Sequence, residues 1–418
     1  MIQLDVWLTL PDASTARVGE LACTDADAAG RFQSEFAYAE EWLRHPQRFA
    51  LDPVSLPVGR GRFLAGKFEP PLGVFDDALP DDWGRALIVR SRQLPREQQG
   101  EPYLLRELAD HGLGLGALAF ARPGTPPAIR TQANDSDLAA LAATAEGFEA
   151  GTENDPDRLR WLFAAGSSIG GARPKALLSD ASGHWIAKLP SAKRDGRFDV
   201  VGLETVGLDL ARGANIAVPD HHLMSLGRPG RALLVRRFDV LPGGGRRHMI
   251  SLRTLCRERA GIHVQAYTEL AEVVRKVSAE PQEDVRRLFQ LMAFNAALGN
   301  TDDHLKNFWM VRDSSGYRLS EAFDLVPDVG ERREHVLVFA YERAAPTRAQ
   351  LLDVAQRWGV AEAGKLIDAV VGSVDAFAVV ARAHGVPVAN IDELTVDIER
   401  RLALLALPER GGRRVAGP

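Results

Sequence analysis

The sequence predicts an α+β fold in two lobes, β-rich at first and mainly helical later. Up to about residue 240, short segments rich in β-branched and aromatic residues alternate with turns of glycine, serine and asparagine. After residue 250 the apolar residues fall at three- and four-residue spacings, which is typical of helices with one buried face. With 418 residues, the chain is long enough for two or three domains.

The first predicted domain, residues 1–125, is a β-rich subdomain. VWLTL and RVGELAC have strand-like composition and are separated by polar turns. The stretch FDDALPDDWGRALIVRSRQ indicates a loop that leads into a helix, with Asp81 or Asp82 as its cap. The glycines of HGLGLGALAF indicate a tight loop before a further strand. Residues 122–136, RPGTPPAIRTQANDS, are rich in turn-forming residues and predict a linker.

The second predicted domain, residues 137–245, forms from about residue 160 a strand, a glycine loop, a strand, a helix and two strands. ARPKALLSD and HWIAKLP flank the turn ASG, which predicts a hairpin. VGLETVGLDLARGANI has helical periodicity and is expected to end near Gly213. RALLVRRFDV is expected to form a strand.

The third predicted domain, residues 246–418, is mainly helical. One hairpin interrupts it, formed by NFWMV, the turn RDSSG, and YRLSEAFDLV. A small β-rich lobe before a helical lobe is the layout of a bilobal protein-kinase-like fold, although other α+β proteins share this order. The predicted helical segments are 266–278, 282–298, 347–358 and 361–384.

Composition excludes several classes of protein. Hydrophobic residues make up 45% and charged residues 26%, which is ordinary for a globular chain. The net charge of −5, with both signs interspersed, argues against direct DNA binding through overall charge but leaves a DNA-binding partner open. Cys23 and Cys256 are far apart and predict neither a disulfide framework nor a zinc site. Charges interrupt every apolar run, and the N-terminus lacks a basic region, so we expect a cytoplasmic protein without membrane segments.

The stretch NTDDHLKNFWMV, residues 300–311, places polar residues directly before an apolar run. Phosphoryl transfer needs a positioned hydroxyl and metal ions across the phosphates. Asp302 is followed five residues later by Asn307, and the next hairpin ends at Asp324. The hairpin would return Asp324 to Asn307, where both could bind Mg²⁺ beside Asp302 as general base. The alternative is an ordinary turn or a helix cap.

Two further residues of this stretch are less decisive. We expect His304 to shape the loop through a hydrogen bond. Lys306 would either contact the γ-phosphate or remain solvated.

A glycine-rich stretch, AAGSSIGGARPKALL at residues 164–178, precedes a predicted strand. It departs from the Walker A motif because Ala172 follows Gly171 where that motif has lysine. Lys188 lies in the apolar strand HWIAKLP, where an ammonium group needs an anionic partner unless it is on an exposed edge. Glu204, on the next helix, could pair with it unless it is an exposed helical glutamate.

The strand LLVRRFD, residues 233–239, would lead to the connection between the lobes. Its backbone could bind adenine. Asp239 could contact the ribose or could lie in a surface turn.

These motifs resemble the HipA-like serine/threonine kinases, the toxins of bacterial type II toxin–antitoxin pairs. SSIGGARPKALL resembles the family's phosphate loop, HWIAKLP its ATP-lysine strand, RRFD its Arg-Phe-Asp segment, and NTDDHLKNF with AFDLVP its catalytic and metal-binding segments. LPDDWGRALI and LGLGALAF resemble its N-terminal subdomain. Arg236 departs from the acidic residue that some members carry before Arg-Phe-Asp.

The resemblance implies an ATP- and Mg²⁺-dependent kinase with Asp302 as its catalytic residue. Asn307 and Asp324 would bind the metal, and Ser168 or the adjacent Ser167 would be autophosphorylated. A phosphate there adds about −1.5 to −2 charge, which opposes nucleotide binding. The implied ATP-binding residues are Ser168, Ile169, Gly170, Gly171, Ala172, Lys175, Lys188, Arg237, Phe238, Asp239, His304 and Lys306.

The same resemblance implies the partners. These are a HipB-like helix-turn-helix antitoxin, through which DNA would be bound indirectly, and a protein substrate such as an aminoacyl-tRNA synthetase. Two alternatives remain open from the residues: a small-molecule phosphotransferase on the same scaffold, and a non-catalytic corepressor or binding protein.

Overall fold

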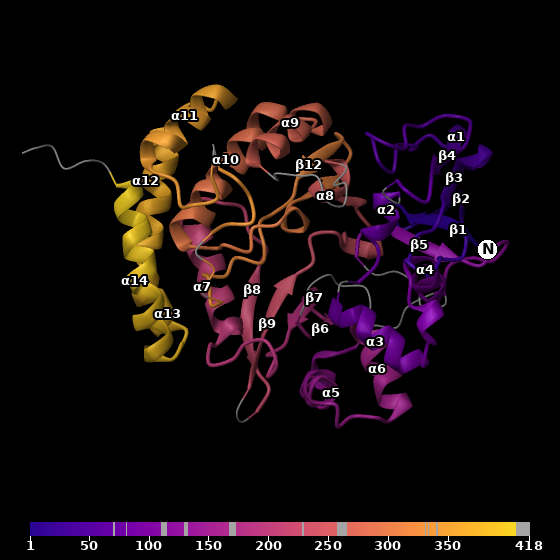
Figure 1. Cartoon of the computed structure of the whole chain (residues 1–418), viewed down its shortest axis with the longest axis horizontal. Helices are drawn as coiled ribbons and strands as arrows, with labels where there is room; N and C mark the ends of the chain where they lie inside the picture. Colours follow the sequence, from indigo (N-terminus) through magenta and orange to yellow (C-terminus); the bar gives the residue numbers. More distant parts are fainter. Residues whose placement is uncertain are drawn as a thin grey trace, which may run out of the picture.

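The computed structural model confirms the predicted α+β architecture (Figure 1). The N-terminal strands lie at one side of the molecule and the helices after residue 347 lie at the other. The described residues are 1–69, 72–80, 82–109, 115–128, 133–166, 173–227, 230–256, 266–330, 332, 334–339 and 342–406.

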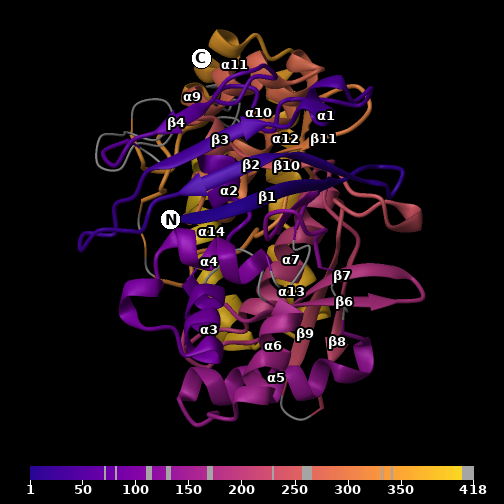
Figure 2. The ribbon, with the colours of Figure 1, turned by 90° about the vertical axis from the view of Figure 1, so that its right-hand side faces the viewer.

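The first sheet is antiparallel, with the strand order β4-β3-β2-β1-β5, and lies above a group of helices in Figure 2. Its strands confirm the β-rich N-terminal region, since alternating residues such as Val6 and Leu8 of β1 are fully buried. Asp82 begins the predicted helix, and Asp81 lies outside the described residues. The elements are β1 (Ile2–Thr9), β2 (Thr15–Cys23), β3 (Ser34–Tyr38), β4 (Phe63–Ala65), β5 (Leu118–Ala121), α1 (Glu40–Arg44), α2 (Gly73–Asp76), α3 (Asp82–Arg92), α4 (Glu101–Ala109) and the 3-10 helix η1 (Arg96–Gln98).

The second sheet has the order β6-β7-β9-β8, and its first hairpin is as predicted. Asp180 Oδ1 accepts the backbone N–H groups of Ser182 and Gly183, which closes the turn. The strand expected near residue 160 is wrong. A helix forms there because Leu159, Leu162 and Phe163 recur at helical spacing and are buried. The elements are η2 (Asp135–Asp137), α5 (Leu138–Ala150), α6 (Pro156–Gly166), β6 (Lys175–Asp180), β7 (Gly183–Lys188), α7 (Val200–Gly213), β8 (His221–Ser225) and β9 (Arg231–Arg236).

The rest of the chain is mainly helical around a three-stranded sheet, β10-β11-β12, which contains the predicted hairpin. The segment 361–384 forms two helices rather than one, with a break around Asp375 and Ala376. The sequence did not predict α14. The elements are η3 (Pro242–Gly244), β10 (Met249–Ser251), α8 (Leu252–Leu255), α9 (Tyr267–Val277), α10 (Pro281–Leu298), η4 (Leu305–Asn307), β11 (Trp309–Arg312), β12 (Tyr317–Leu319), α11 (Arg348–Trp358), α12 (Ala363–Val374), α13 (Phe377–Ala383) and α14 (Val388–Leu405).

The helix α7 connects the second sheet to the C-terminal helices. It packs on β8 and β9 with one side and on α12 and α13 with the other, as Figure 1 shows. Ser373 of α12 donates a hydrogen bond of 2.6 Å to the carbonyl of Leu210 on α7. The helix α7 is therefore fixed between the second sheet and the C-terminal helices.

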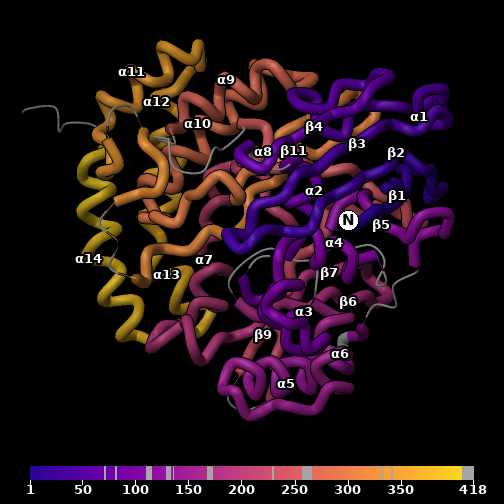
Figure 3. Tube along the Cα trace, turned by 45° about the vertical axis from the view of Figure 1, so that its right-hand side comes forward, coloured from indigo at the N-terminus to yellow at the C-terminus, as the bar shows by residue number. Residues whose placement is uncertain are grey.

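The N-terminal region packs beside the third sheet, as the trace in Figure 3 allows the reader to follow. Tyr317 Oη donates 2.8 Å to the carbonyl of Ala50, and His248 Nε2 lies 2.8 Å from the carbonyl of Leu51. Across the part of the chain that the structure describes, no helix has both the length and the apolar character to cross a membrane.

Candidate active site

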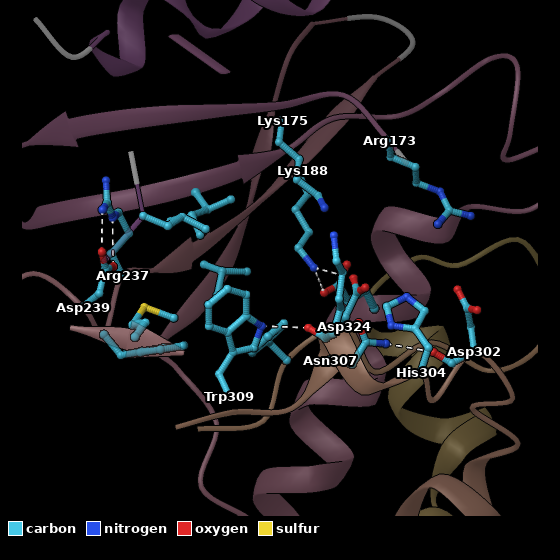
Figure 4. A pocket seen from close by; sticks show the side chains of 18 of the residues that line it. Arg173, Lys175, Lys188, Arg237, Asp239, Asp302, His304, Asn307, Trp309 and Asp324 are labelled. Atoms are coloured by element: carbon cyan, nitrogen blue, oxygen red, sulfur yellow. Dashed lines mark hydrogen bonds and ion pairs between the residues drawn. The ribbon is translucent and has the colours of Figure 1, made fainter. Parts of the chain in front are cut away.

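A cavity of about 480 Å³ lies between the second sheet and the segment that follows α10. Its walls come from β7, β9 and α7 on one side and from η4, β11 and the Asp324 segment on the other. Figure 4 shows Lys188, Asp324, Asn307 and His304 gathered in one region and the Arg237–Asp239 pair at the opposite end. A volume of this size accommodates a ligand such as a nucleotide.

Lys188 is the last residue of β7, and its ammonium contacts two carboxylates. Its Nζ donates to Glu204 Oε1 on α7 and, at 2.8 Å, to Asp324 Oδ1. Burial alone would lower the pKa of Lys188, but these carboxylates raise it to about 12. The predicted Lys188–Glu204 contact is thus present, and both alternatives fail: Lys188 does not point to solvent, and Glu204 is only 4% exposed.

Asp324 has an unusual backbone conformation at the cavity wall. Its φ of +60° lies in the left-handed region, which non-glycine residues adopt only when their surroundings impose it. Burial alone would raise the pKa of Asp324, but the charges of Lys188 and Lys175 lower it well below its usual value. The carboxylate is therefore ionised and available to a cation.

The helix α7 contacts the backbone beside Asp324 through a glycine. A Cβ on Gly207 would lie 1.9 Å from the carbonyl oxygen of Leu325. Gly207→Ala is therefore expected to lower the free energy of unfolding by about 1–3 kcal/mol, as overpacking does. Denaturant unfolding would measure it, with Gly372→Ala of α12 as the matched control, because no atom lies within 4 Å of a Cβ there. Equal stability of the two variants would contradict close packing of α7.

Asp302 and Asn307 lie at the other wall of the cavity. Asn307 Nδ2 donates 2.8 Å to the backbone carbonyl of Asp302, which closes the loop and leaves the amide oxygen as the atom suited to a cation. The Asp302 side chain is 61% exposed and its Oδ1 is 2.6 Å from Arg332 Nη1. The structure therefore brings Asp302, Asn307, Asp324 and Lys188 to one cavity.

Lys175 and Lys188 are directly opposite on neighbouring antiparallel strands, so their side chains share a face. Both line the cavity, where their ammonium groups can contact an anion. His304 and Lys306 line the same cavity. The remaining predicted phosphate-loop residues lie outside the described part of the chain; they are Ser167, Ser168, Ile169, Gly170, Gly171 and Ala172.

The Arg237–Asp239 pair occupies the far end of the cavity. Arg237 Nε and Nη2 bind the two oxygens of Asp239 at 3.0 and 2.6 Å, and the backbone N–H of Gly116 donates 2.7 Å to Asp239 Oδ2. Burial alone would raise the pKa of Asp239, but Arg237 lowers it. The surface-turn alternative is wrong, since Asp239 is 2% exposed. Its internal contacts favour a structural role over the expected ribose contact. Phe238 lies beside them, with its ring centroid 6.2 Å from that of Phe323.

Several cavity residues were not predicted. Arg173 lines it and binds Asp195 at 2.6 Å. Asp77 comes from the N-terminal region and accepts both the N–H and the hydroxyl of Ser251. Burial raises the pKa of Asp77 to about 6, although these hydrogen bonds oppose the rise. Its partner lies 174 residues further along the chain, so no local spacing could have revealed it.

The ligand atoms that the protein supplies fit magnesium better than zinc. Among the described residues no group of three or more His, Cys, Asp or Glu could hold a metal ion. Asp324 and Asn307 supply oxygen ligands only. Magnesium commonly takes one or two protein oxygens and completes its shell with water and phosphate. These residues therefore fit a magnesium–nucleotide complex.

The two-lobed α+β fold and this cavity define a protein-kinase-like protein. Two family profiles match the sequence: the HipA N-terminal domain over residues 4–120 and the HipA-like C-terminal domain over residues 167–378. The second match alone spans half of the chain. The chain therefore belongs to the HipA-like family.

Three individual proteins are similar to this chain to different degrees. The Sinorhizobium fredii protein Y4mE, which its name describes provisionally as a kinase, is 29% identical over 325 residues, 70% of this chain and 72% of that protein. HipA of Shewanella oneidensis, solved with HipB and operator DNA, has a TM-score of 0.66 and 18% identity over 96% of this chain and 95% of its own, which establishes the shared fold. The Helicobacter pylori kinase CtkA is more distant, with a TM-score of 0.40 and 12% identity over 55% of this chain and 90% of its own.

Proposed function

We propose that the protein is an ATP- and Mg²⁺-dependent serine/threonine protein kinase of the HipA type, acting in the cytoplasm. One observation carries the proposal: Asp302, Asn307, Asp324 and the Lys188–Glu204 pair converge on a single cavity. These are the parts that protein kinases use, in the same order along the chain.

The geometry supports a role for each residue. Lys188 and Lys175 bind the ATP phosphates, and Glu204 holds Lys188 in place. Asn307 and Asp324 would hold magnesium, which would supply positive charge to the phosphate oxygens. Asp302 accepts the proton of the attacking hydroxyl group. The oxygen of that hydroxyl group forms a bond to the γ-phosphorus as the bond between the γ-phosphorus and ADP breaks.

Incubation with labelled ATP, Mg²⁺ and cell extract tests this function. We expect label on protein above that of the extract alone, with no such excess without Mg²⁺ and an excess lower by roughly 10²-fold or more with Asp302→Ala. Label on a small molecule alone would favour the phosphotransferase alternative. Absence of any Mg²⁺-dependent ATP turnover would favour a non-catalytic corepressor or binding protein.

Autophosphorylation is expected at Ser168. A phosphate on this residue of the proposed phosphate loop would add about −1.5 to −2 charge and would oppose ATP binding. Ser168→Ala should therefore abolish self-labelling and, if the protein is a toxin, strengthen growth arrest. Mass spectrometry of the wild-type protein identifies the phosphorylated residue, and Ser167→Ala is the matched control. Phosphate at Ser167 or elsewhere would contradict the assignment to Ser168.

The partners follow from the family. The Shewanella relative was solved with HipB and operator DNA, which supports a HipB-like helix-turn-helix antitoxin as partner here and indirect contact with DNA. We propose a protein substrate involved in translation, such as an aminoacyl-tRNA synthetase. Phosphoproteomics that compares wild type with Asp302→Ala would identify it.

A further inference from the structure

A buried polar cluster lies beneath the loop that carries the proposed catalytic residue. Asp303, the next residue, is fully buried. Its carboxylate accepts the Tyr267 hydroxyl at 2.7 Å and the backbone N–H groups of Val336 and Leu337 at 2.9 and 3.2 Å. A fourth contact, at 3.2 Å, joins it to His335 Nδ1. These contacts hold the backbone directly beside Asp302.

The second nitrogen of that histidine contacts an arginine from the last helix. Arg401, on α14, is 1% exposed, and its Nη1 lies 3.0 Å from His335 Nε2. A guanidinium group can only donate hydrogen bonds, so Nε2 must accept. The proton then resides on Nδ1, which donates to Asp303. Arg401 therefore selects the tautomer of His335 that binds Asp303.

Arg401 also supports the start of the catalytic loop. Its Nη1 donates 3.4 Å to the carbonyl of Ala296 in the last turn of α10. A Cβ on Gly299, which follows that helix with a φ of +74°, would lie 2.8 Å from the Arg401 Nε. The same guanidinium group thus contacts the beginning of the loop directly, and it is linked to Asp303, next to Asp302, through His335.

We propose that Arg401 is a positioning residue for Asp302, acting through His335 and Asp303. The proposal rests on the proposed kinase function. Loss of Arg401 frees His335 to change tautomer or rotate, and the backbone that carries Asp302 shifts. Lys188, which would contact nucleotide from another segment, keeps its place, whereas Asn307 and Lys306 lie in the same loop as Asp302. The expected signature is a large decrease in kcat with a smaller rise in the KM for ATP.

The neighbouring arginine of α14 provides a matched control. Arg401 Nε also donates to Asp397 Oδ2, and Arg400 binds the other oxygen of the same carboxylate, but the Arg400 side chain is 62% exposed. We expect Arg401→Met to lower kcat by roughly 10-fold or more, because small misplacements of a catalytic group are costly. Arg400→Met should leave kcat unchanged, and Arg401→Lys, which still donates to His335, should recover most of it.

Amide hydrogen exchange provides a readout that does not depend on activity. Arg401→Met should speed exchange in residues 300–308 and leave β6 and β7 unaffected, whereas Arg400→Met should do neither. Should Arg401→Met fail to fold, His335→Phe, which removes the same relay and retains a ring, carries the same expectation. Unchanged exchange in the catalytic loop would overturn the proposal. A wild-type protein without phosphoryl transfer would overturn the proposed function instead, and exchange would still decide the role of Arg401.

Discussion

Asp302→Ala is expected to reduce phosphoryl transfer by roughly 10²-fold or more, the scale of general acid–base catalysis. The fold should survive, because the side chain is 61% exposed and its ion pair with Arg332 lies at the surface. Such pairs contribute only about 0–1 kcal/mol. Catalysis and stability are therefore separable at this position, which makes the result easy to interpret.

The measurement is single-turnover transfer of the γ-phosphate, with nucleotide affinity and thermal unfolding recorded on the same samples. Asp353→Ala is a suitable control, since Asp353 forms a comparable exposed ion pair with Arg357 on α11. We expect the control to retain full activity and Asp302→Ala to retain ATP binding. Near-normal transfer by Asp302→Ala would remove this residue from the reaction.

The convergence of Asp302, Asn307 and Asp324 on one cavity could be predicted from the sequence because the geometry of this segment is local. Asn307 lies five residues after Asp302, and a tight hairpin returns the chain to Asp324. A hairpin fixes its own register, so proximity follows from spacing. The pairing of Lys188 with Glu204 was predictable for a similar reason, because α7 is the next element after β7 along the chain.

Other features depend on contacts between distant segments and had no local pattern. Asp239 is buried because Gly116, 123 residues earlier, donates to it. Asp77 enters the cavity only because the first sheet packs beside the third. The helix α6 was mistaken for a strand because a short apolar run does not distinguish the two by composition alone.

The role proposed for the C-terminal helix α14 could not be predicted from the sequence either. The sequence did not predict α14, and nothing near Arg401 in the chain suggests a link to the catalytic loop. The contact with His335 exists only after α10 and α14 pack together. Local motifs therefore indicated the proposed catalytic and metal-binding residues, whereas the residues that hold them in place could be found only in the folded chain.

Lys188→Met should have two separate effects, one on catalysis and one on stability. The ammonium is the cation that contacts Glu204, whose side chain is only 6% exposed. Removing one partner of a buried pair leaves an uncompensated charge and costs about 3–5 kcal/mol of folding free energy. The loss of the phosphate contact should independently reduce transfer by about 10²-fold, as losing one electrostatic contact to the transition state does.

The double variant Lys188→Met/Glu204→Gln separates the two effects. It removes the more buried of the two carboxylates together with its cation, while Asp324, whose side chain is 36% exposed, remains charged beside solvent, so much of the lost stability should return. Activity should not return, because no cation remains to bind the phosphates. Denaturant unfolding and γ-phosphate transfer would be measured for both variants, with Lys365→Met, a 76% exposed lysine paired with Glu362, as control. If the double variant regained ATP turnover along with stability, Lys188 would serve the fold alone, and the proposed phosphate site would have to lie elsewhere in the cavity.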